Sequence, residues 1–315
     1  VSLPSFDANV MTTAISSEQW RLLSEDPAKP FFNRIVQATY APGSLYKAVT
    51  SLAGLTTGVV DTLSVLEPCT GGYRFGNRVF RCWKRTGHGV LDHAGALEHS
   101  CDVFYYQLGL RLELADIERA VRAFGLGSRV TGIYPGEAAG HIPTREWYDR
   151  RLGRGGWTRG VMLNNSIGQG EVLVTPLQMA LLSARIAANG EVPGPTFVLG
   201  QEPAVPVADL PFAPAHVHWI QDALRQVVDT GTWGAARIAG VPVAGKTGTT
   251  ENPHGDDHAW FMCYAPADAP RVAVAVILEN AGHGGAKAAP VAGAWLREYF
   301  RWHAARTAAG AEGGV

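Results

Sequence analysis

The chain has 315 residues and a mass of 33.6 kDa, enough for one large domain or two small ones with a buried core. Its 27 basic and 28 acidic residues give a formal net charge of −1, and 17% of its residues are charged. This excludes the strongly basic surface of a nucleic-acid-binding protein and the composition of an acidic disordered chain. Hydrophobic residues make up 46%, and no apolar run approaches the roughly 18–20 residues of a membrane span.

The first half of the chain is predicted to consist of loops and short helices. Residues 1–43 are punctuated by proline and serine and are expected to be mostly irregular, with a short helix at 17–23. A helix is expected over 44–55, directly after a Pro-Gly turn. Residues 71–89 are dense in glycine, arginine and aromatic residues and predict a loop or a short hairpin. Apolar periodicity predicts three further helices, at 91–99, 103–112 and 114–124.

The second half changes character. Residues 132–160 are loop-rich, and amphipathic helices are predicted at 176–189 and 215–230. An apolar-striped helix at 289–303 closes the domain, and the small-residue tail 308–315 is expected to be flexible. Helices in the middle and paired strands near the end predict an α+β fold with the last helix covering the sheet. The strands are expected in short β-rich runs, as in an antiparallel meander, at 239–250, 259–264 and 271–279.

Lysine is rare in this chain, with five lysines against 22 arginines. One of the five, Lys47, lies three residues after Ser44. Residues three apart share a face of a helix, so the serine hydroxyl is expected beside the ammonium group, and a lysine of lowered pKa can take the proton of a serine nucleophile. The start of the helix adds N–H donors suited to an oxyanion. Alone, such a pair also occurs in ordinary exposed helix turns.

Two later motifs contain the residue types that would complete such a site. The stretch Ser100–Asp102 lies at a predicted break between two helices, where serine and aspartate are also common N-caps. The stretch Lys246–Thr249 lies on a predicted strand. Its glycine lets a ligand or another backbone approach closely, its lysine and threonines can hold a carboxylate, and the Thr249 N–H can be a second oxyanion donor. The alternative for this stretch is an edge strand protected by a lysine.

Three cysteines and one histidine lie within 33 residues of one another: Cys69, Cys82, His88 and Cys101. Three thiolates and an imidazole make a closed tetrahedral set for a structural zinc ion, although the spacings are not those of a zinc finger. A disulfide is the competing interpretation, and a third is that these are small buried residues. The fourth cysteine, Cys263, is predicted to be a small core residue.

Taken in this order, the three motifs resemble the S-x-x-K, S-D-N and K-T-G motifs of the penicillin-binding proteins and serine β-lactamases. Two of the five lysines fall on the two positions that require lysine. The segment with Cys82-Trp-Lys and Gly87-His-Gly89 is most similar to the penicillin-binding protein 2 type, the elongation transpeptidases. The resemblance covers nearly all of residues 1–303. It extends to three stretches that look like class B penicillin-binding proteins, at 31–47, 165–178 and 258–266.

The resemblance implies the penicillin-binding protein/serine β-lactamase-like fold over residues 1–307, in which an antiparallel sheet is flanked by helices and joined to an all-helical subdomain. It implies that a membrane anchor, a pedestal domain and the first strands of the sheet lie outside this chain, so one sheet edge is expected to be exposed. The implied location is the periplasmic face of the bacterial inner membrane.

The resemblance also implies a peptidoglycan D,D-transpeptidase. Ser44 is expected to attack the stem peptide, Lys47 to act as its base, and Ser100 to relay protons near Asp102. Many relatives have asparagine at the position of Asp102, and two nearby lysines predict that the aspartate is ionised. The N–H groups of Ser44 and Thr249 are expected to form the oxyanion hole. The residues expected at the substrate carboxylate and along this strand are Lys246, Thr247, Gly248 and Thr249.

No cofactor is expected for catalysis, but the resemblance supports a structural zinc ion at the Cys/His set, because some relatives bind zinc near these positions. The expected partners are stem peptides, β-lactams, which would acylate Ser44, and a membrane glycosyltransferase of the elongation machinery; no nucleic acid is expected. Two alternatives remain. A β-lactamase would need a water-activating residue such as a glutamate, and a non-catalytic β-lactam sensor would stay acylated.

Overall fold

A three-stranded antiparallel sheet of order β3-β4-β5 lies at the centre of the computed structural model, which describes residues 1–12, 14–206, 209–231 and 234–308. The strands are β3 (Ala244–Thr250), β4 (His258–Ala265) and β5 (Val272–Leu278). Side chains alternate between the faces of a strand. On β4, Trp260 therefore faces one hydrophobic core and Phe261 faces another.

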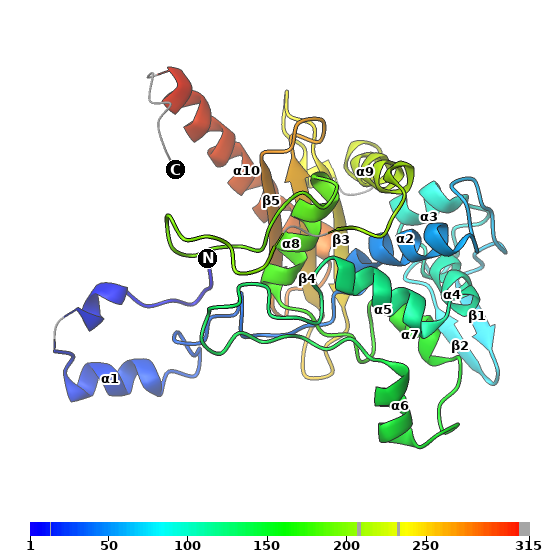
Figure 1. Cartoon of the computed structure of the whole chain (residues 1–315), viewed down its shortest axis with the longest axis horizontal. Helices are drawn as coiled ribbons and strands as arrows, with labels where there is room; N and C mark the ends of the chain where they lie inside the picture. Colours follow the sequence, from blue (N-terminus) through cyan, green and yellow to red (C-terminus); the bar gives the residue numbers. More distant parts are fainter. Residues whose placement is uncertain (13, 207–208, 232–233, 309–315) are drawn as a thin grey trace.

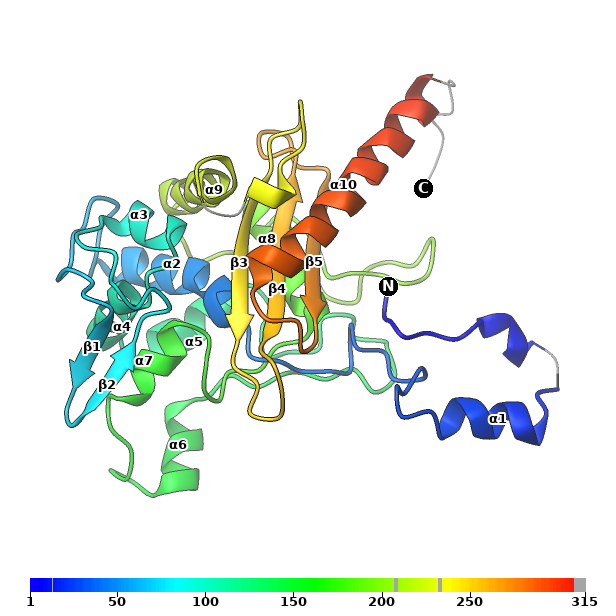
Figure 2. The same cartoon turned by 180° about the vertical axis from the view of Figure 1, so that it is seen from behind.

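Each face of the sheet is covered by a helix (Figures 1 and 2). Helix α8 (Pro176–Ala187) begins with a capping box at Thr175 and packs on β4 and β5 from one side. Helix α10 (Gly284–Ala308) packs on the other side, where its small buried residues Ala288, Ala289 and Ala292 meet β4 closely. The sheet and its two covering helices make three layers, so the strands are shielded on both faces.

A helical subdomain lies beside the β3 edge of the sheet, on the right in Figure 1. In its core α2 packs on α4, α5 and α9, and α4 packs on α7. A two-stranded antiparallel hairpin, β1 (Gly72–Phe75) and β2 (Arg78–Arg81), packs against α4. The helices of this subdomain are α2 (Lys47–Thr57), α3 (His93–Glu98), α4 (Asp102–Arg111), α5 (Leu114–Ala123), α7 (Val161–Ser166) and α9 (Pro214–Asp229).

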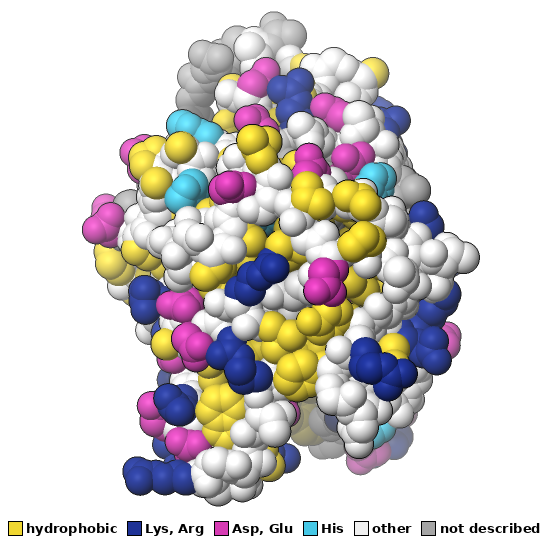
Figure 3. Space-filling model, turned by 90° about the vertical axis from the view of Figure 1, so that its right-hand side faces the viewer, with side chains coloured by type: hydrophobic (Ala, Val, Ile, Leu, Met, Phe, Trp, Pro, Cys, Tyr) yellow, Lys and Arg dark blue, Asp and Glu magenta, His cyan; other side chains and the backbone are white. Residues whose placement is uncertain are grey.

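The end of the molecule that carries this hairpin shows hydrophobic side chains exposed among side chains of both charge signs (Figure 3). Exposed hydrophobic residues of this region include Val79, Trp83 and Val90. Because basic and acidic groups are interspersed, this face has no extended field of one sign, which agrees with the near-neutral composition.

Two further helices lie at the periphery. Helix α1 (Ser17–Ser24), closed by a capping box at Ser16, has no buried residue and stands apart from the sheet (Figure 1). Helix α6 (Arg145–Leu152) lies within the connection from α5 to α7. Three single turns complete the structure: η1 (Ala8–Met11), η2 (Gly43–Tyr46) and η3 (Gly234–Ala236). None of the helices in the described ranges has both the length and the apolar character needed to cross a membrane.

The α+β architecture and the order of its elements are confirmed, with local corrections. The predicted helix 44–55 is a 3₁₀ turn followed by α2, and the strand predicted from residue 239 begins at Ala244. The last helix begins at Gly284 rather than 289, with Pro290 inside it instead of at its start. The prediction omitted α7, and it treated the α6 segment as loop although Thr144 caps that helix by accepting a bond from the Trp147 N–H.

Two predictions concern the ends of the chain: a flexible tail at 308–315 and an exposed edge of the sheet. Ala308 is the last residue of α10, and the rest of the predicted tail, 309–315, lies outside the described residues. Strand β5 pairs with β4 alone within the described part of the chain. That earlier strands of the sheet lie outside this chain stays a prediction.

Candidate active site

The first motif lies where turn η2 passes into α2. The backbone N–H of Lys47 donates to the Ser44 carbonyl, closing a 3₁₀ turn. In a 3₁₀ turn the side chains of residues i and i+3 eclipse each other, so the Ser44 and Lys47 side chains leave the chain on the same side. Ser44 is partly exposed, whereas Lys47 is completely buried. A serine that a ligand can reach thus lies next to a lysine that is buried beneath it.

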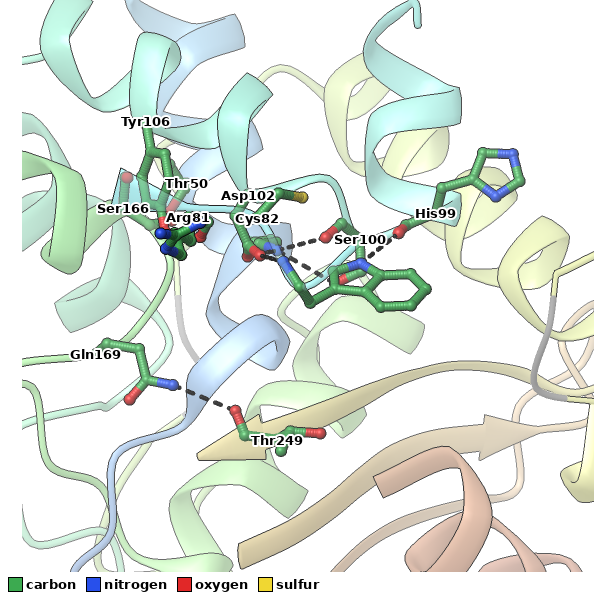
Figure 4. A network of polar contacts seen from close by, with 12 residues as sticks. Thr50, Arg81, Cys82, His99, Ser100, Asp102, Tyr106, Ser166, Gln169 and Thr249 are labelled. Atoms are coloured by element: carbon green, nitrogen blue, oxygen red, sulfur yellow. Dashed lines mark hydrogen bonds and ion pairs between the residues drawn. The ribbon is translucent and has the colours of Figure 1, made fainter. Parts of the chain in front are cut away.

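The Lys47 ammonium uses its three hydrogens within the second motif. Its Nζ lies 2.9 Å from the Ser100 carbonyl oxygen, 3.1 Å from Ser100 Oγ and 2.7 Å from Asp102 Oδ1. Figure 4 shows Ser100 and Asp102 close together. Ser100 has a φ of +54°, a conformation that serine rarely adopts and that turns the chain between α3 and α4. Neither side chain caps α4, whose N-cap is Cys101 and which begins at Asp102.

The Asp102 carboxylate has a second partner, the N–H of Trp83, at 2.9 Å from Oδ2. Trp83 follows the β1–β2 hairpin, and its indole Nε1–H donates to the His99 carbonyl at 3.1 Å. Asp102 also lies in the first turn of α4, where the helix dipole favours a negative charge. The carboxylate therefore joins the lysine of the first motif to the loop that carries Cys82.

The third motif lies on β3, and the free edge of this strand runs beside the turn that carries Ser44. The Thr249 carbonyl accepts a bond of 3.2 Å from Gln169 Nε2, so it points away from β4. The N–H and C=O of one strand residue point to the same side, and the Thr249 N–H therefore faces this free edge as well. Gly43 has a φ of +55°, and a Cβ there would lie 2.7 Å from the Thr249 oxygen. The backbone that precedes Ser44 is therefore in close contact with the backbone at Thr249.

Lys246 lies on the face of β3 that meets the helical subdomain and is completely buried. Its Nζ donates to the Thr247 carbonyl at 3.3 Å. The pKa of Lys246 is lowered to about 7, chiefly by burial and then by the nearby Lys47 charge, while Asp102 opposes the shift. Near neutral pH this amine is close to half protonated, so a nearby anion can change its charge.

The side chains of the third motif divide between the two faces of the sheet. Thr247 and Thr249 pair with Phe261 and Ala259, which belong to the core under α10, so they lie on the opposite face from Lys246. The Gly284 N–H makes a long bond of 3.4 Å to Thr249 Oγ1. The feature that the residues of the third motif share is the backbone edge of β3. That Lys246, Thr247 and Thr249 bind one carboxylate together stays a prediction.

The Cys/His set converges into one cluster. The ligand atoms of its four members lie within 4.8 Å of one another, and Cys82 Sγ lies 3.5 Å from His88 Nδ1. For Zn–S near 2.3 Å and Zn–N near 2.0 Å, tetrahedral geometry puts S···N at about 3.6 Å and S···S at about 3.8 Å. A hydrogen bond between the thiols lowers the pKa of Cys82 and raises that of Cys101. The donor set fits zinc after a contraction of about 1 Å or less at its widest pair.

The cluster is held together by backbone contacts around the loop. Cys69 and Gly89 form an isolated antiparallel bridge, with N···O distances of 2.8 and 3.0 Å. The Cys82 N–H donates to the Gly71 carbonyl at 3.0 Å. All four cysteines are free thiols in the structure, and Cys263 is buried in β4 as expected of a small core residue. The loop 69–89 is thus folded back on itself before any metal is considered.

The sequence profile of the penicillin-binding protein transpeptidase domain matches residues 1–297. The chain belongs to this family. The match covers all three motifs and the Cys/His loop, and it confirms the family resemblance and the fold that it implied.

Three proteins illustrate what this transpeptidase domain is similar to in sequence and structure. The peptidoglycan D,D-transpeptidase MrdA of Acinetobacter baumannii is 32% identical over 94% of this chain and 48% of its own length. The penicillin-binding protein PBP2 of Helicobacter pylori, solved with MreC, has a TM-score of 0.86 and 27% identity over 95% of this chain and 57% of its own. Penicillin-binding protein A of Mycobacterium tuberculosis, solved as an acyl-enzyme complex, has a TM-score of 0.80 and 28% identity, with coverages of 94% and 69%. The chain spans about half the length of the curated relatives it matches.

Some contacts of this transpeptidase domain had no sequence signal. The Trp83 N–H and the Gln169 amide both bind site residues, although neither was singled out for a role in the site. Glu171, in the stretch Gly168-Gln-Gly-Glu171, accepts a 2.9 Å bond from the Tyr148 hydroxyl. In the described structure its carboxylate has no contact with Ser44 or Lys47.

Proposed function

We propose that this chain is the catalytic domain of a peptidoglycan D,D-transpeptidase that acts in cell-wall elongation through an acyl-enzyme at Ser44. The observation that carries the proposal is the buried Lys47 ammonium, bonded to Ser100 and Asp102 one short turn after Ser44. Burying two lysines with one carboxylate costs folding free energy. Buried ionisable groups beside an open serine, among them Lys246 with its lowered pKa, are typical of an active site.

In the acylation step Ser44 Oγ bonds to the carbonyl carbon of the penultimate D-Ala, and the bond to the nitrogen of the terminal D-Ala breaks. The neutral form of Lys47 takes the Ser44 proton, and Ser100 Oγ, 3.1 Å from Lys47 Nζ, passes a proton to the leaving nitrogen. In the second step an amine of a neighbouring stem peptide attacks the ester. Its proton returns by the same groups to Ser44, and a cross-link is left.

The N–H groups of Ser44 and Thr249 stabilise the oxyanion of both steps. The contact between Gly43 and the Thr249 oxygen supports this pairing, because it brings the two backbones together without an intervening side chain. Preorganised donors of this kind are usually the largest single contribution to acyl-transfer catalysis. The substrate carboxylate lies along the β3 edge at Thr247, Gly248 and Thr249, and Lys246 supplies positive charge from the opposite face.

A β-lactam would acylate Ser44 as the stem peptide does, and the acyl-enzyme complex of the M. tuberculosis relative supports this. A β-lactamase is the weaker candidate, because the carboxylate of Glu171 is bonded to Tyr148. A sensor that stays acylated differs from the enzyme only in failing to transfer the acyl group.

Partners outside the site would be elongation proteins, including a membrane glycosyltransferase, and the location would be the periplasmic face of the inner membrane. The H. pylori relative solved with MreC supports a partner protein outside the site.

Cys69, Cys82, His88 and Cys101 would hold a structural zinc ion. The thiol and imidazole donors and the 3.5 Å Cys82–His88 distance support this. A closed four-ligand site supplies folding free energy instead of a Lewis acid for catalysis. Here it would fix the loop 69–89 and, through Trp83, the position of Asp102. The free thiols and the shared donor geometry favour metal over the disulfide alternative.

The test of the proposed function is release of D-Ala from a synthetic stem peptide ending in D-Ala-D-Ala, with an added amine acceptor. We expect D-Ala release and a transferred peptide product with the wild-type chain and neither with Ser44→Ala. Hydrolysis of penicillin within seconds would identify a β-lactamase instead. Stable acylation by penicillin without any peptide turnover would identify a sensor.

A further inference from the structure

A second buried polar pair lies one helical turn behind the Lys47–Asp102 ion pair. Ser51 follows Lys47 by four residues on α2, and Tyr105 follows Asp102 by three on α4, so each shares a helix face with its predecessor. The Ser51 and Tyr105 hydroxyl oxygens are 2.8 Å apart, and Lys47 Nζ and Asp102 Oδ1 are 2.7 Å apart. The two helices are therefore joined by two successive polar contacts.

The second pair continues to a buried histidine. His93 Nε2 lies 3.0 Å from Ser51 Oγ, and its Nδ1 lies 3.0 Å from the Asp61 carbonyl oxygen. Burial lowers the pKa of His93 to about 4, so the ring is neutral and carries one N–H. A carbonyl oxygen only accepts, which places that hydrogen on Nδ1. Nε2 then accepts from Ser51, and Ser51 in turn accepts from the Tyr105 hydroxyl.

This directed chain of hydrogen bonds ends at the aromatic ring of Tyr105, whose centroid lies 5.3 Å from Lys47 Nζ. The face of an aromatic ring attracts a cation, and a phenol that donates its proton has a more electron-rich ring. The charged groups that face Lys47 are Asp102 and, from β3, Lys246. Lys47 also begins α2, where the helix dipole disfavours a cation. The Tyr105 ring therefore attracts the Lys47 ammonium at a place where Asp102 is the one carboxylate near both Lys47 and Lys246.

We propose that Tyr105 is a positioning residue for Lys47, and that Asp61, His93 and Ser51 hold Tyr105 in place. The ring, 5.3 Å from Lys47 Nζ, helps to keep the nitrogen beside Ser100 Oγ and one short turn after Ser44. The inference rests on the proposed role of Lys47 in acylation. It adds a requirement that none of the three motifs contains.

The test separates acylation from binding. The acylation rate constant k2 and the dissociation constant of the preceding complex are measured from the concentration dependence of labelling by a fluorescent penicillin. The variants are Tyr105→Leu, which removes the ring, Tyr105→Phe, which removes only the hydroxyl, and Ser51→Ala, which leaves the tyrosine unanchored. The matched control is Tyr106→Phe on the same helix, which removes a partly buried hydrogen bond of the hydroxyl to the Arg81 carbonyl.

We expect k2 to fall about 30-fold in Tyr105→Leu and about 5-fold in Tyr105→Phe and Ser51→Ala, with an unchanged dissociation constant. Tyr106→Phe should lower the melting temperature without changing k2. Equal loss of k2 in Tyr105→Phe and Tyr106→Phe, or a change confined to the dissociation constant, would overturn the inference. If Tyr105→Leu does not fold, Tyr105→Phe and Ser51→Ala decide. Failure of the wild-type chain to be acylated at all would refute the proposed function instead.

Discussion

The Asp102 carboxylate lies 2.7 Å from Lys47 Nζ, in a pair whose lysine is completely buried and whose aspartate side chain is 12% exposed. The other carboxylate oxygen is bonded to the Trp83 N–H. The ion pair therefore links the proposed catalytic lysine to the loop that carries the Cys/His cluster. Loss of either partner would leave a buried charge without compensation.

Replacing Asp102 should therefore affect stability strongly. We expect Asp102→Ala to lower the free energy of unfolding by about 3–5 kcal/mol, because it strands the Lys47 charge. Asp102→Asn keeps an oxygen for Lys47 but turns an NH₂ group toward the Trp83 N–H, and should cost about 1–3 kcal/mol. Denaturant unfolding measures both. Asp229→Ala, which breaks an exposed pair with Arg225, should cost less than about 1 kcal/mol, and an equal loss in all three variants would refute the argument.

Gly43 should be required for acylation, not only for folding. Gly43→Ala should lower k2 for penicillin at least about 100-fold, the loss typical of one oxyanion donor, because its Cβ would push the Thr249 oxygen away. Gly58 is the control, since its φ of +72° is also left-handed but a Cβ there meets no atom within 4 Å. Gly58→Ala should share the backbone strain and keep k2 within about 2-fold. Similar k2 values in the two variants would contradict the proposed oxyanion hole.

Binding of a carboxylate ligand should depend on pH through Lys246. The folded protein holds this lysine with a pKa of about 7, against 10.5 for the free side chain. A bound carboxylate favours the charged form and raises the pKa, so a proton is taken up and affinity should fall as pH rises above 7, by up to about tenfold per unit. The dissociation constant of a penicillin before acylation, measured from pH 6 to 9, tests this. Lys246→Gln should flatten the profile, and a flat profile in the wild type would rule out the linkage.

The same lysine should destabilise the fold near neutral pH. Between about 7 and 10.5 the unfolded chain binds the Lys246 proton and the folded chain does not, so stability should rise with pH across this window. Lys246→Met should remove that dependence and raise the melting temperature at pH 7, as expected for an active-site residue retained at a cost in stability.

Zinc content should follow the four-residue cluster. Purified protein should contain about one equivalent of zinc, and Cys82→Ser should lose it together with thermal stability. Cys263→Ser is the matched control, because Cys263 is equally buried but lies in β4 outside the cluster. Metal analysis and melting curves with and without a chelator give the result. Wild-type protein without zinc, or an unchanged content in Cys82→Ser, would contradict the site.

The three motifs were predictable because they occur together in the order typical of the family, and because two of them need a lysine, which is rare in this chain. Two of five lysines occupy motif positions, and the structure brings Lys47, Ser100, Asp102 and Lys246 together. A strand implies that neighbouring side chains alternate between its faces, but which face carries Lys246 and which carries the threonines depends on how the sheet packs, so it was not predicted. The pairing of Thr247 and Thr249 with β4 places them under α10.

Other features were hidden for different reasons. The Trp83 and Asp102 contact uses a backbone N–H, which leaves no trace in residue type. Helix α6 is held by a threonine cap and is polar enough to resemble a loop. By contrast, the Ser51–Tyr105 contact follows the i+4 and i+3 spacing from Lys47 and Asp102, so it could be predicted once the two helices were known to pair through those residues.

The most direct test of the central claim is a mass measurement of the protein after reaction with benzylpenicillin. We predict a single penicilloyl adduct that persists for many minutes, maps to the peptide containing Ser44, and is absent in Ser44→Ala. An adduct on another residue, or no adduct on folded wild-type protein, would contradict the account.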